Sequence, residues 1–486
     1  MIWTDATAMA EAVRKKEVSA VELVNQTIEK IEALNPKINA VVYKQYDEAL
    51  KIATSKEFGQ APFAGVPLLL KDLGQEQAGA ISTSGSVLFS DYRCTRTDYY
   101  VSALEKLGFI IVGRTNTPEY GFKNISDSRL HGSVSLPLDF SRNAGGSSGG
   151  AAAAIASGMV PLAAASDGGG SIRIPASFNG LIGLKPTRGR IPVGPSSYRG
   201  WQGASTTFAL TKTVRDTRNL LYYLQTCQLE SPFPLPLLTK ESLFSPKMKS
   251  PLKIAFSDKS PIGAPVSQVA KRALKKTLSF LEELGHEIYE LKEEPIDGIA
   301  AMQSYYLMSS VETAAMFDKI ESNLGRKMQQ KDMELMTWAI YQSGQKILAK
   351  DFTTCLEQWD QFSAQMARFH QTYDLYLTPT TADVAPKKDE FLLPKEIQEQ
   401  LQQIEFYSVS EQQDLIWKMF EKSLAWTPFT QQANLTGQPS ISLPVYQDDS
   451  GLPIGVQMTA AKGRENLLIS IAQIIEEAGM FLPKNL

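Results

Sequence analysis

The chain has 486 residues, of which 43% are hydrophobic and 21% are charged, and its formal net charge is -3. This is the composition of a globular protein with a large buried core, and its scattered lysines and arginines argue against direct nucleic-acid binding. Its apolar stretches fall short of the roughly 20 strongly apolar residues of a membrane span, and three widely spaced cysteines favour a cytoplasmic setting without disulfides or a metal site.

Helices and strands alternate in the first half of the chain. Ser19 and Glu22 form a capping box ahead of an apolar 3.6-residue period, which predicts a helix near the N-terminus. Thr213 and Asp216 form a second capping box. The other expected elements are a strand over 65–70, a helix over 98–107, strands over 109–113, 159–165 and 181–185, and a helix over 213–226. This alternation is typical of layered α/β proteins.

A proline-rich segment over 229–252 excludes a regular helix and predicts a linker or surface excursion. The pattern of elements resumes after this segment. The expected elements are a strand over 252–257, a helix over 267–284, a strand over 287–291, long helices within 298–372, and strands near 374–378, 440–445 and 454–459. We therefore predict one mixed α/β domain, with a central twisted sheet covered by helices on both faces.

Two glycine-rich segments stand out between apolar elements. The first runs from Gly145 to Gly150 and contains Ser147 and Ser148, and the second is Asp-Gly-Gly-Gly-Ser over 167–171. Each glycine costs folding entropy, so such segments inside a folded core indicate loops whose backbone approaches a ligand closely. A nucleotide-phosphate loop would end in Gly-Lys-Ser or Gly-Lys-Thr, and no lysine follows either segment.

Ser171 ends the second segment and is the candidate nucleophile. The backbone N–H groups of Gly168, Gly169, Gly170 and Ser171 carry almost no side-chain bulk, which suits an oxyanion hole around a carbonyl that gains negative charge. A serine hydroxyl also needs a base that removes its proton.

Lys71 is the favoured base, because it ends the apolar run 65–70 and burial would lower its pKa toward the neutral amine. The alternative for an isolated lysine is a side chain that reaches solvent at the strand end. His131 precedes the first glycine-rich segment and remains a second candidate base, whereas His286 and His370 have a structural interpretation.

Lys71 and the two glycine-rich segments resemble the amidase signature family. Further matching segments follow in the family's order along nearly the whole chain, although 228–375 aligns only loosely. They are Gly113-Arg114-Thr115-Asn116-Thr117-Pro118-Glu119, Gly183-Leu184-Lys185-Pro186-Thr187, Asn434-Leu435-Thr436-Gly437-Gln438-Pro439 and Gly451-Leu452-Pro453-Ile454-Gly455-Val456-Gln457. The resemblance implies an amidase that cleaves a C–N bond of a small-molecule amide through an acyl-enzyme, without a metal or cofactor.

The resemblance also implies a Ser-cisSer-Lys triad. Ser171 would attack, Ser147 would relay the proton through a cis peptide after Gly146, and Lys71 would be the base. The residues with supporting roles would be Ser148, Asp167 and Arg173, of which Asp167 and Arg173 could equally form a purely structural ion pair. The implied amidase domain covers 1–486, with N-terminal helices over 1–60, a catalytic signature core over 61–228, the proline-rich excursion over 229–252, and a part over 253–486 that completes the sheet and substrate pocket.

Several functional alternatives follow from the same residues. The sequence is closest in appearance to the aminohexanoate cyclic-dimer hydrolase branch, but 132–142 and 208–209 depart from the common family pattern. The competing class is a glutaminase that resembles the ammonia-supplying subunit of glutamyl-tRNA amidotransferase and acts with partner chains. A binding protein without catalysis is a third class. Each of the three classes is compatible with a homodimer. Trp426 and Phe429 would either line an apolar substrate pocket or belong to the core.

Overall fold

An 11-stranded mixed sheet runs through the molecule in the order β1-β3-β2-β8-β10-β9-β14-β15-β13-β11-β12. The structure is a computed structural model that describes residues 4–246 and 251–483. The strands of the sheet are β1 (Val41–Lys44), β2 (Pro67–Lys71), β3 (Ile110–Thr115), β8 (Ala163–Asp167), β9 (Ile182–Lys185), β10 (Thr206–Thr211), β11 (Lys253–Phe256), β12 (Glu287–Glu290), β13 (Leu375–Pro379), β14 (Ser440–Gln447) and β15 (Pro453–Ala460).

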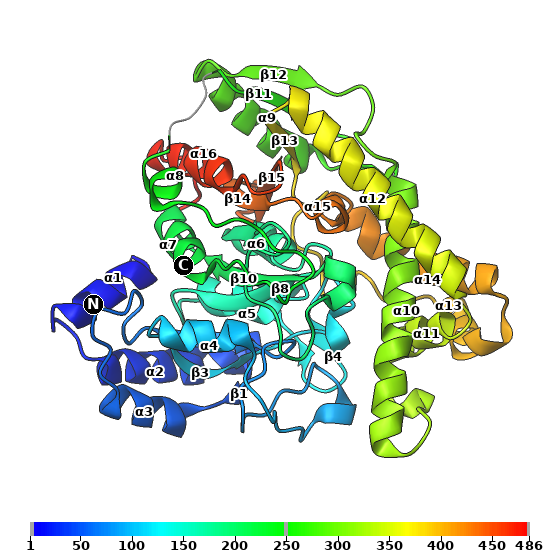
Figure 1. Cartoon of the computed structure of the whole chain (residues 1–486), viewed down its shortest axis with the longest axis horizontal. Helices are drawn as coiled ribbons and strands as arrows, with labels where there is room; N and C mark the ends of the chain where they lie inside the picture. The colour runs from blue at the N-terminus through cyan, green and yellow to red at the C-terminus, as the bar shows by residue number, and fades with distance from the viewer. Residues whose placement is uncertain (1–3, 247–250, 484–486) are drawn as a thin grey trace.

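The two halves of the chain share this one sheet. Strands from the first half run from β1 to β9, and β9 pairs with β14 of the second half in antiparallel fashion. Figure 1 shows the sheet running from β1 at the bottom of the molecule to β12 at the top. The predicted fold, a single mixed sheet covered by helices, is confirmed.

Helices cover the sheet on both faces (Figure 1). Helix α5 packs on β2, β3, β8 and β10, and its neighbour α6, which it contacts, packs on β9, β14 and β15. The helices are α1 (Ala6–Arg14), α2 (Ala20–Ile38), α3 (Tyr46–Ser55), α4 (Tyr99–Lys106), α5 (Gly149–Ala156), α6 (Arg173–Asn179), α7 (Val214–Leu224), α8 (Lys240–Phe244), α9 (Gln268–Glu283), α10 (Gly298–Leu324), α11 (Leu335–Gly344), α12 (Ala349–Thr372), α13 (Lys395–Gln402), α14 (Val409–Trp426), α15 (Gln431–Thr436) and α16 (Glu465–Glu477).

A second hydrophobic core lies beside the sheet. Helices α10, α11, α13 and α14 pack together at the right of Figure 1 around buried aromatic and aliphatic side chains. Tyr120, in the short 3-10 turn η2 (Glu119–Gly121), joins this core from the first half of the chain. Leu88 and Phe89, from the loop that follows β2, also pack against this core, so the helical layer reaches the loops that follow both β2 and β3.

The two predicted capping boxes have different outcomes. Ser19 accepts from the Glu22 N–H while Glu22 reaches back to the Ser19 N–H, so the first capping box is confirmed. Thr213 caps α7 by accepting from the Asp216 N–H at 3.1 Å. However, the Asp216 carboxylate accepts from the N–H groups of Ala6 and Thr7 at the start of α1, so it does not complete a capping box.

Within the proline-rich segment, the structure corrects one expectation. Residues 240–244 form the short helix α8, which Thr239 caps by accepting from the Ser242 N–H. This helix fits between Pro236 and Pro246, because proline is excluded from a helix interior but not from its flanks.

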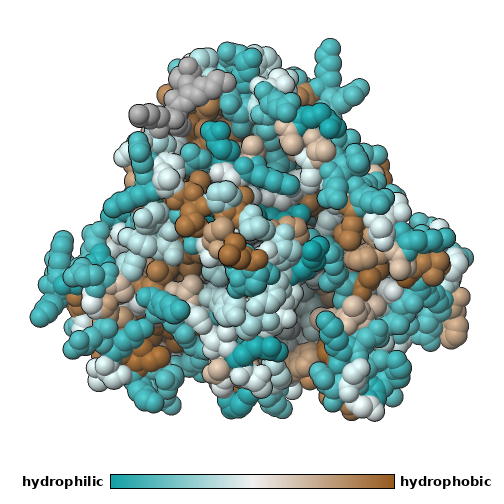
Figure 2. All heavy atoms as spheres, in the orientation of Figure 1, coloured by the Kyte–Doolittle hydropathy of each residue, from teal (hydrophilic) through white to brown (hydrophobic). Residues whose placement is uncertain are grey.

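The surface of the face shown in Figure 2 is mainly hydrophilic, with hydrophobic residues in separate patches. Among the described residues, no helix is both long enough and apolar enough to cross a membrane.

Candidate active site

Lys71 is the last residue of β2 and is completely buried. Its Nζ atom lies 2.7 Å from Ser147 Oγ and 3.0 Å from Ser166 Oγ. Burial lowers the pKa of Lys71 to about 7, and the nearby Asp167 carboxylate opposes this shift only in part. A substantial fraction of the Lys71 side chains is therefore the neutral amine near neutral pH.

Ser147 and Ser148 lie immediately before α5. The Gly146–Ser147 peptide bond is cis. A Cβ atom on Gly146 would lie only 2.6 Å from the Ile125 backbone, so the chain needs glycine here. Ser148 Oγ donates to the Ser166 carbonyl oxygen at 3.2 Å, which ties this segment to β8.

The loop after β8 presents backbone N–H groups next to Ser171. Among the described residues, the N–H groups of Gly168, Gly169 and Ser171 have no hydrogen-bond partner. The Gly170 N–H is different, because it donates to Asp167 Oδ1 at 2.7 Å. Gly168, Gly169 and Ser171 therefore keep N–H groups available for the expected oxyanion hole, whereas the N–H of Gly170, whose φ is 128°, ties the loop to Asp167.

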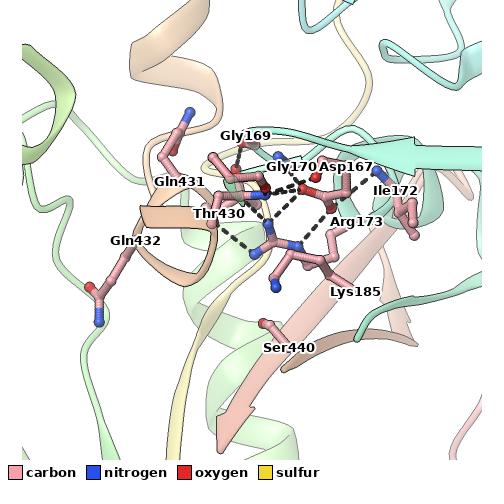
Figure 3. A network of polar contacts seen from close by, with 12 residues as sticks. Asp167, Gly169, Gly170, Ile172, Arg173, Lys185, Thr430, Gln431, Gln432 and Ser440 are labelled. Carbon is pink, nitrogen blue, oxygen red and sulfur yellow. Dashed lines mark hydrogen bonds and ion pairs between the residues drawn. The ribbon is translucent and has the colours of Figure 1, made fainter. Parts of the chain in front are cut away.

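Asp167 and Arg173 form a buried ion pair beneath this loop. Arg173 Nε and Nη2 donate to the two oxygens of Asp167 at 2.9 Å each, and Nη2 also donates to Asn434 Oδ1 at 2.7 Å. Figure 3 shows this network with Thr430, which donates to the Gly169 carbonyl oxygen at 2.6 Å. Burial alone would raise the pKa of Asp167, but the Arg173 charge and its hydrogen bonds lower that pKa to about 2. Asp167 is therefore a fixed anion that positions the loop.

Of the two contacts that the implied relay from Ser171 through Ser147 to Lys71 needs, the structure contains the one between Ser147 and Lys71. No hydrogen bond joins Ser147 and Ser171, although both line one cavity of about 190 Å³, which we call the front cavity. Its other lining residues include Ser166, Gly168, Gly169, Tyr120, Trp201, Thr207 and Tyr305. Ser166 is a site residue that no sequence pattern indicated, and its place on β8 next to Lys71 depends on strand pairing.

His131 does not contact either candidate serine. Its Nε2 atom lies 3.0 Å from Thr83 Oγ1, and Thr83 Oγ1 in turn donates to the Asp72 carboxylate. Because the Thr83 hydroxyl proton points to Asp72, the His131 N–H donates to Thr83. This arrangement ties the loop 129–131 to the segment after β2, and it gives His131 a structural contact.

Ser171 also lines a second, smaller cavity of about 50 Å³, which we call the inner pocket. Its lining is mixed. The apolar side chains are Phe122, Ile174, Met302, Phe420 and Leu424, and the polar ones include Lys123, Asn124, Ser423, Thr427, Gln431 and the two tyrosines Tyr305 and Tyr306. Trp426 and Phe429 line neither cavity with Ser171; Trp426 donates its indole N–H to the Val384 carbonyl oxygen at 2.8 Å, and Phe429 is buried. The core interpretation of these two aromatic residues is therefore the correct one.

No group of three or more His, Cys, Asp or Glu side chains in the described part of the chain is placed to hold a metal ion.

The chain is similar to amide hydrolases over nearly its whole length. A family model described as Amidase matches residues 22–469. A lipoamidase of Enterococcus faecalis is 39% identical over 97% of this chain, which spans 63% of the length of that relative. A 6-aminohexanoate-cyclic-dimer hydrolase of Paenarthrobacter ureafaciens is 32% identical over 98% of this chain and 95% of its own. A solved structure of a 6-aminohexanoate cyclic dimer hydrolase with substrate has a TM-score of 0.88, at 31% identity over 99% of this chain and 97% of that one.

Proposed function

The chain belongs to the amidase family, and from this premise we propose a free-standing amidase in which Ser171 is the nucleophile and Lys71 the base. The enzyme is a hydrolase of C–N bonds other than peptide bonds. The observation that carries the mechanism is the buried contact of Lys71 Nζ with Ser147 Oγ at 2.7 Å, beside the cavity that Ser147 and Ser171 both line.

In the first half of the reaction, neutral Lys71 takes the hydroxyl proton of Ser147, which takes that of Ser171. Ser171 Oγ then bonds to the amide carbon, and the N–H groups of Gly168, Gly169 and Ser171 stabilise the oxyanion. When the C–N bond breaks, the leaving nitrogen receives the proton back through Ser147. Catalytic hydrogen bonds commonly tighten when substrate binds, and this relay requires the Ser147 and Ser171 hydroxyls to come into contact.

In the second half, water attacks the acyl-enzyme ester. The same relay passes one water proton to Lys71, and the bond between Ser171 Oγ and the acyl carbon breaks. The carboxylic acid leaves, and Lys71 returns its proton through Ser147 to Ser171.

The substrate class follows from the walls of the two cavities. Neither the front cavity nor the inner pocket is lined by an Asp or Glu side chain of the described residues. Burying the charged amino group of glutamine there would be unfavourable, because no carboxylate compensates it. The aliphatic and aromatic side chains of the inner pocket instead favour amides with an aliphatic or aryl acyl group. The lipoamidase and cyclic-dimer hydrolase relatives make aliphatic amides the first substrates to test.

The test is an amide panel with the purified full chain. Aliphatic and aryl amides are assayed beside glutamine for release of amine or ammonia, without ATP, metal or a partner, and with Ser171→Ala as the control. We expect turnover of the hydrophobic amides by the wild type and none by the variant. Glutamine hydrolysis that appears only with added amidotransferase partner chains would overturn the free-standing enzyme.

A further inference from the structure

The two cavities that meet at Ser171 assign the two halves of an amide substrate, if the proposed function holds. Ser147 lines the front cavity and does not line the inner pocket. The group that returns a proton to the leaving nitrogen must lie within hydrogen-bond reach of it. The leaving amine therefore occupies the front cavity, and the acyl group points into the inner pocket.

A third cavity lies behind the inner pocket. It has a volume of about 460 Å³, and we call it the outer chamber. Lys123, Asn124 and Ser423 line both the inner pocket and the outer chamber, so these residues form the wall between them. The other residues that line the outer chamber are Ile125, Asp127, Ser128, Arg129, Glu334, Leu335, Met336, Lys388, Phe391, Leu392, Leu393, Gln398 and Met419.

Asn124 forms a hydrogen-bonded bridge in the wall that the two spaces share. Its Nδ2 atom donates to the Ser423 carbonyl oxygen at 2.7 Å and to Thr427 Oγ1 at 2.8 Å, which ties the segment after η2 to α14. An inner pocket of about 50 Å³ holds only a few carbon atoms of an acyl chain. A longer chain must displace or pass this bridge and enter the outer chamber.

Three cationic and two acidic side chains line the outer chamber. Both acidic groups are engaged by one cation, because Lys123 Nζ lies 2.7 Å from Asp127 Oδ1 and 2.8 Å from Glu334 Oε2. Burial would lower the pKa of Lys123, but these two carboxylates raise that pKa, so Lys123 remains charged.

The side chains of the other two cations, Arg129 and Lys388, have no carboxylate partner among the described residues, although the Arg129 backbone N–H donates to Glu334 Oε1 at 2.7 Å. Arg129 Nη2 donates to the Lys331 carbonyl oxygen at 2.9 Å, and Lys388 Nζ donates to Ser135 Oγ at 2.8 Å. Both contacts are with neutral oxygens, so no carboxylate compensates the positive charge of either side chain. Each side chain also has further N–H donors for a ligand.

We infer that the outer chamber is a binding subsite for the anionic end of an elongated acyl group. The middle of the acyl chain crosses the inner pocket beside its apolar side chains, such as Phe122, Phe420 and Leu424, and a terminal carboxylate binds Arg129 and Lys388. The substrate class is thus the half-amides of aliphatic dicarboxylic acids, cleaved at their amide end.

The test compares acyl anilides that differ only at the far end of the acyl chain. Hexanoyl and octanoyl anilides, which end in a methyl group, are compared with the matching adipoyl and suberoyl anilides, which end in a carboxylate. Aminohexanoyl anilide, which ends in an ammonium group, completes the set, and acetyl anilide reports on the catalytic site. The readout is the ratio of kcat/KM values between termini within one enzyme, because this ratio cancels changes in folding or in the catalytic site.

We expect the wild type to prefer the carboxylate over the methyl terminus by about tenfold, as for charged hydrogen bonds at a partly exposed site. Arg129→Gln and Lys388→Met should each reduce this ratio, and the double variant should abolish it. Lys387→Met is the matched control, because it removes the same charge from a neighbouring residue that does not line the chamber. Asn124→Ala should raise kcat/KM for the octanoyl anilide relative to the acetyl anilide, because it removes the bridge.

A wild type without preference for the carboxylate at either length would overturn this inference. So would a preference for the ammonium terminus, or a carboxylate preference that survives in the double variant. Hydrolysis of acetyl anilide in these cases would leave the proposed function intact. If no anilide or other amide is hydrolysed, the proposed function itself fails, and the subsite fails with it.

Discussion

Lys71 and Ser147 are 76 residues apart in the sequence, yet Lys71 Nζ and Ser147 Oγ lie 2.7 Å apart in the interior. Strand β2 ends at Lys71 beside β8, and the Ser147 segment lies across these strands because α5 packs on both. The sheet and this helix together bring the amine to the hydroxyl. The proposed relay therefore depends on the fold and not on any local sequence motif.

The first prediction concerns the pH dependence of turnover. Burial lowers the pKa of Lys71 to about 7, and only the neutral amine accepts a proton. We expect kcat/KM to rise with pH through about 7 and to level off above it. Lys185 is the control, because burial and the Arg173 charge lower its pKa to about 7 as well. In Lys185→Met, kcat/KM should still fall as the pH drops below about 7, which we call the acid limb of the profile. If this fall disappeared, the titrating group would be Lys185 and not Lys71.

The second prediction concerns Ser166, whose hydroxyl is the other contact of Lys71 Nζ at 3.0 Å. Ser166→Ala should lower kcat/KM by about tenfold, the cost of one hydrogen bond to a charged or polar group. The variant should also change the pH at which kcat/KM falls on acidification, because the Ser166 hydroxyl contacts the titrating amine of Lys71. Steady-state kinetics across the pH range measure both effects. An unchanged rate and an unchanged limb would mean that Ser166 has no part in positioning Lys71.

The third prediction concerns the ion pair beneath the loop. Arg173→Met leaves the Asp167 carboxylate buried without its cation, so the free energy of unfolding should fall by about 3–5 kcal/mol. Urea denaturation measures this loss. Lys395→Met breaks the exposed pair with Glu399 and should cost less than about 1 kcal/mol.

The same pair predicts a pH dependence of stability. The folded pKa of Asp167, about 2, lies below the value of 3.8 that applies without the fold. The contribution of the ionised Asp167 to the free energy of unfolding should therefore be complete above about pH 4 and should be lost as the pH falls toward 2. If Arg173→Met and Lys395→Met lost similar amounts of stability at neutral pH, the interpretation that the buried Asp167–Arg173 pair anchors the loop would be contradicted.

The fourth prediction concerns Gly170, where a Cβ atom would lie 2.2 Å from Thr430 Oγ1. Gly170→Ala should lower turnover by about a hundredfold or more, because the displaced loop carries the oxyanion donors. Gly479→Ala is the control that separates steric clash from backbone strain at a positive φ. Gly479 has a φ of 70°, but no atom lies close to the position of its Cβ. That control should cost about 1 kcal/mol of stability and no activity. Wild-type turnover by Gly170→Ala would show that the loop does not need this close contact.

Local sequence signals predicted the elements better than they predicted side-chain partners. The Ser19 and Glu22 pattern produced a capping box, because both partners lie within one helical turn. Thr213 and Asp216 have the same spacing, but α1 packs against α7 and its N–H groups capture Asp216 across more than 200 residues. No local pattern distinguishes these two cases.

The candidate site was predictable where chemistry is tied to residue type. Glycine next to serine, and a lysine at the end of an apolar run, pointed to Ser147, Ser171 and Lys71. Ser166 was missed because its role arises only when β8 places it beside Lys71. The use of the Gly170 N–H by Asp167 was also invisible, since it depends on the backbone conformation of the loop. The sequence also left open whether Trp426 lines the substrate pocket or belongs to the core, and the hydrogen bond from its indole N–H to the Val384 carbonyl oxygen decides for the core.

The most direct test of the proposed nucleophile is the site of labelling by a fluorophosphonate. The enzyme is incubated with the reagent, and intact mass and peptide mapping locate the adduct. We predict one adduct, on Ser171, with loss of amide turnover in step with its formation and no adduct on Ser171→Ala. An adduct on Ser147, Ser148 or Thr83 with Ser171 unmodified, in an enzyme that has lost turnover, would contradict the assignment of Ser171.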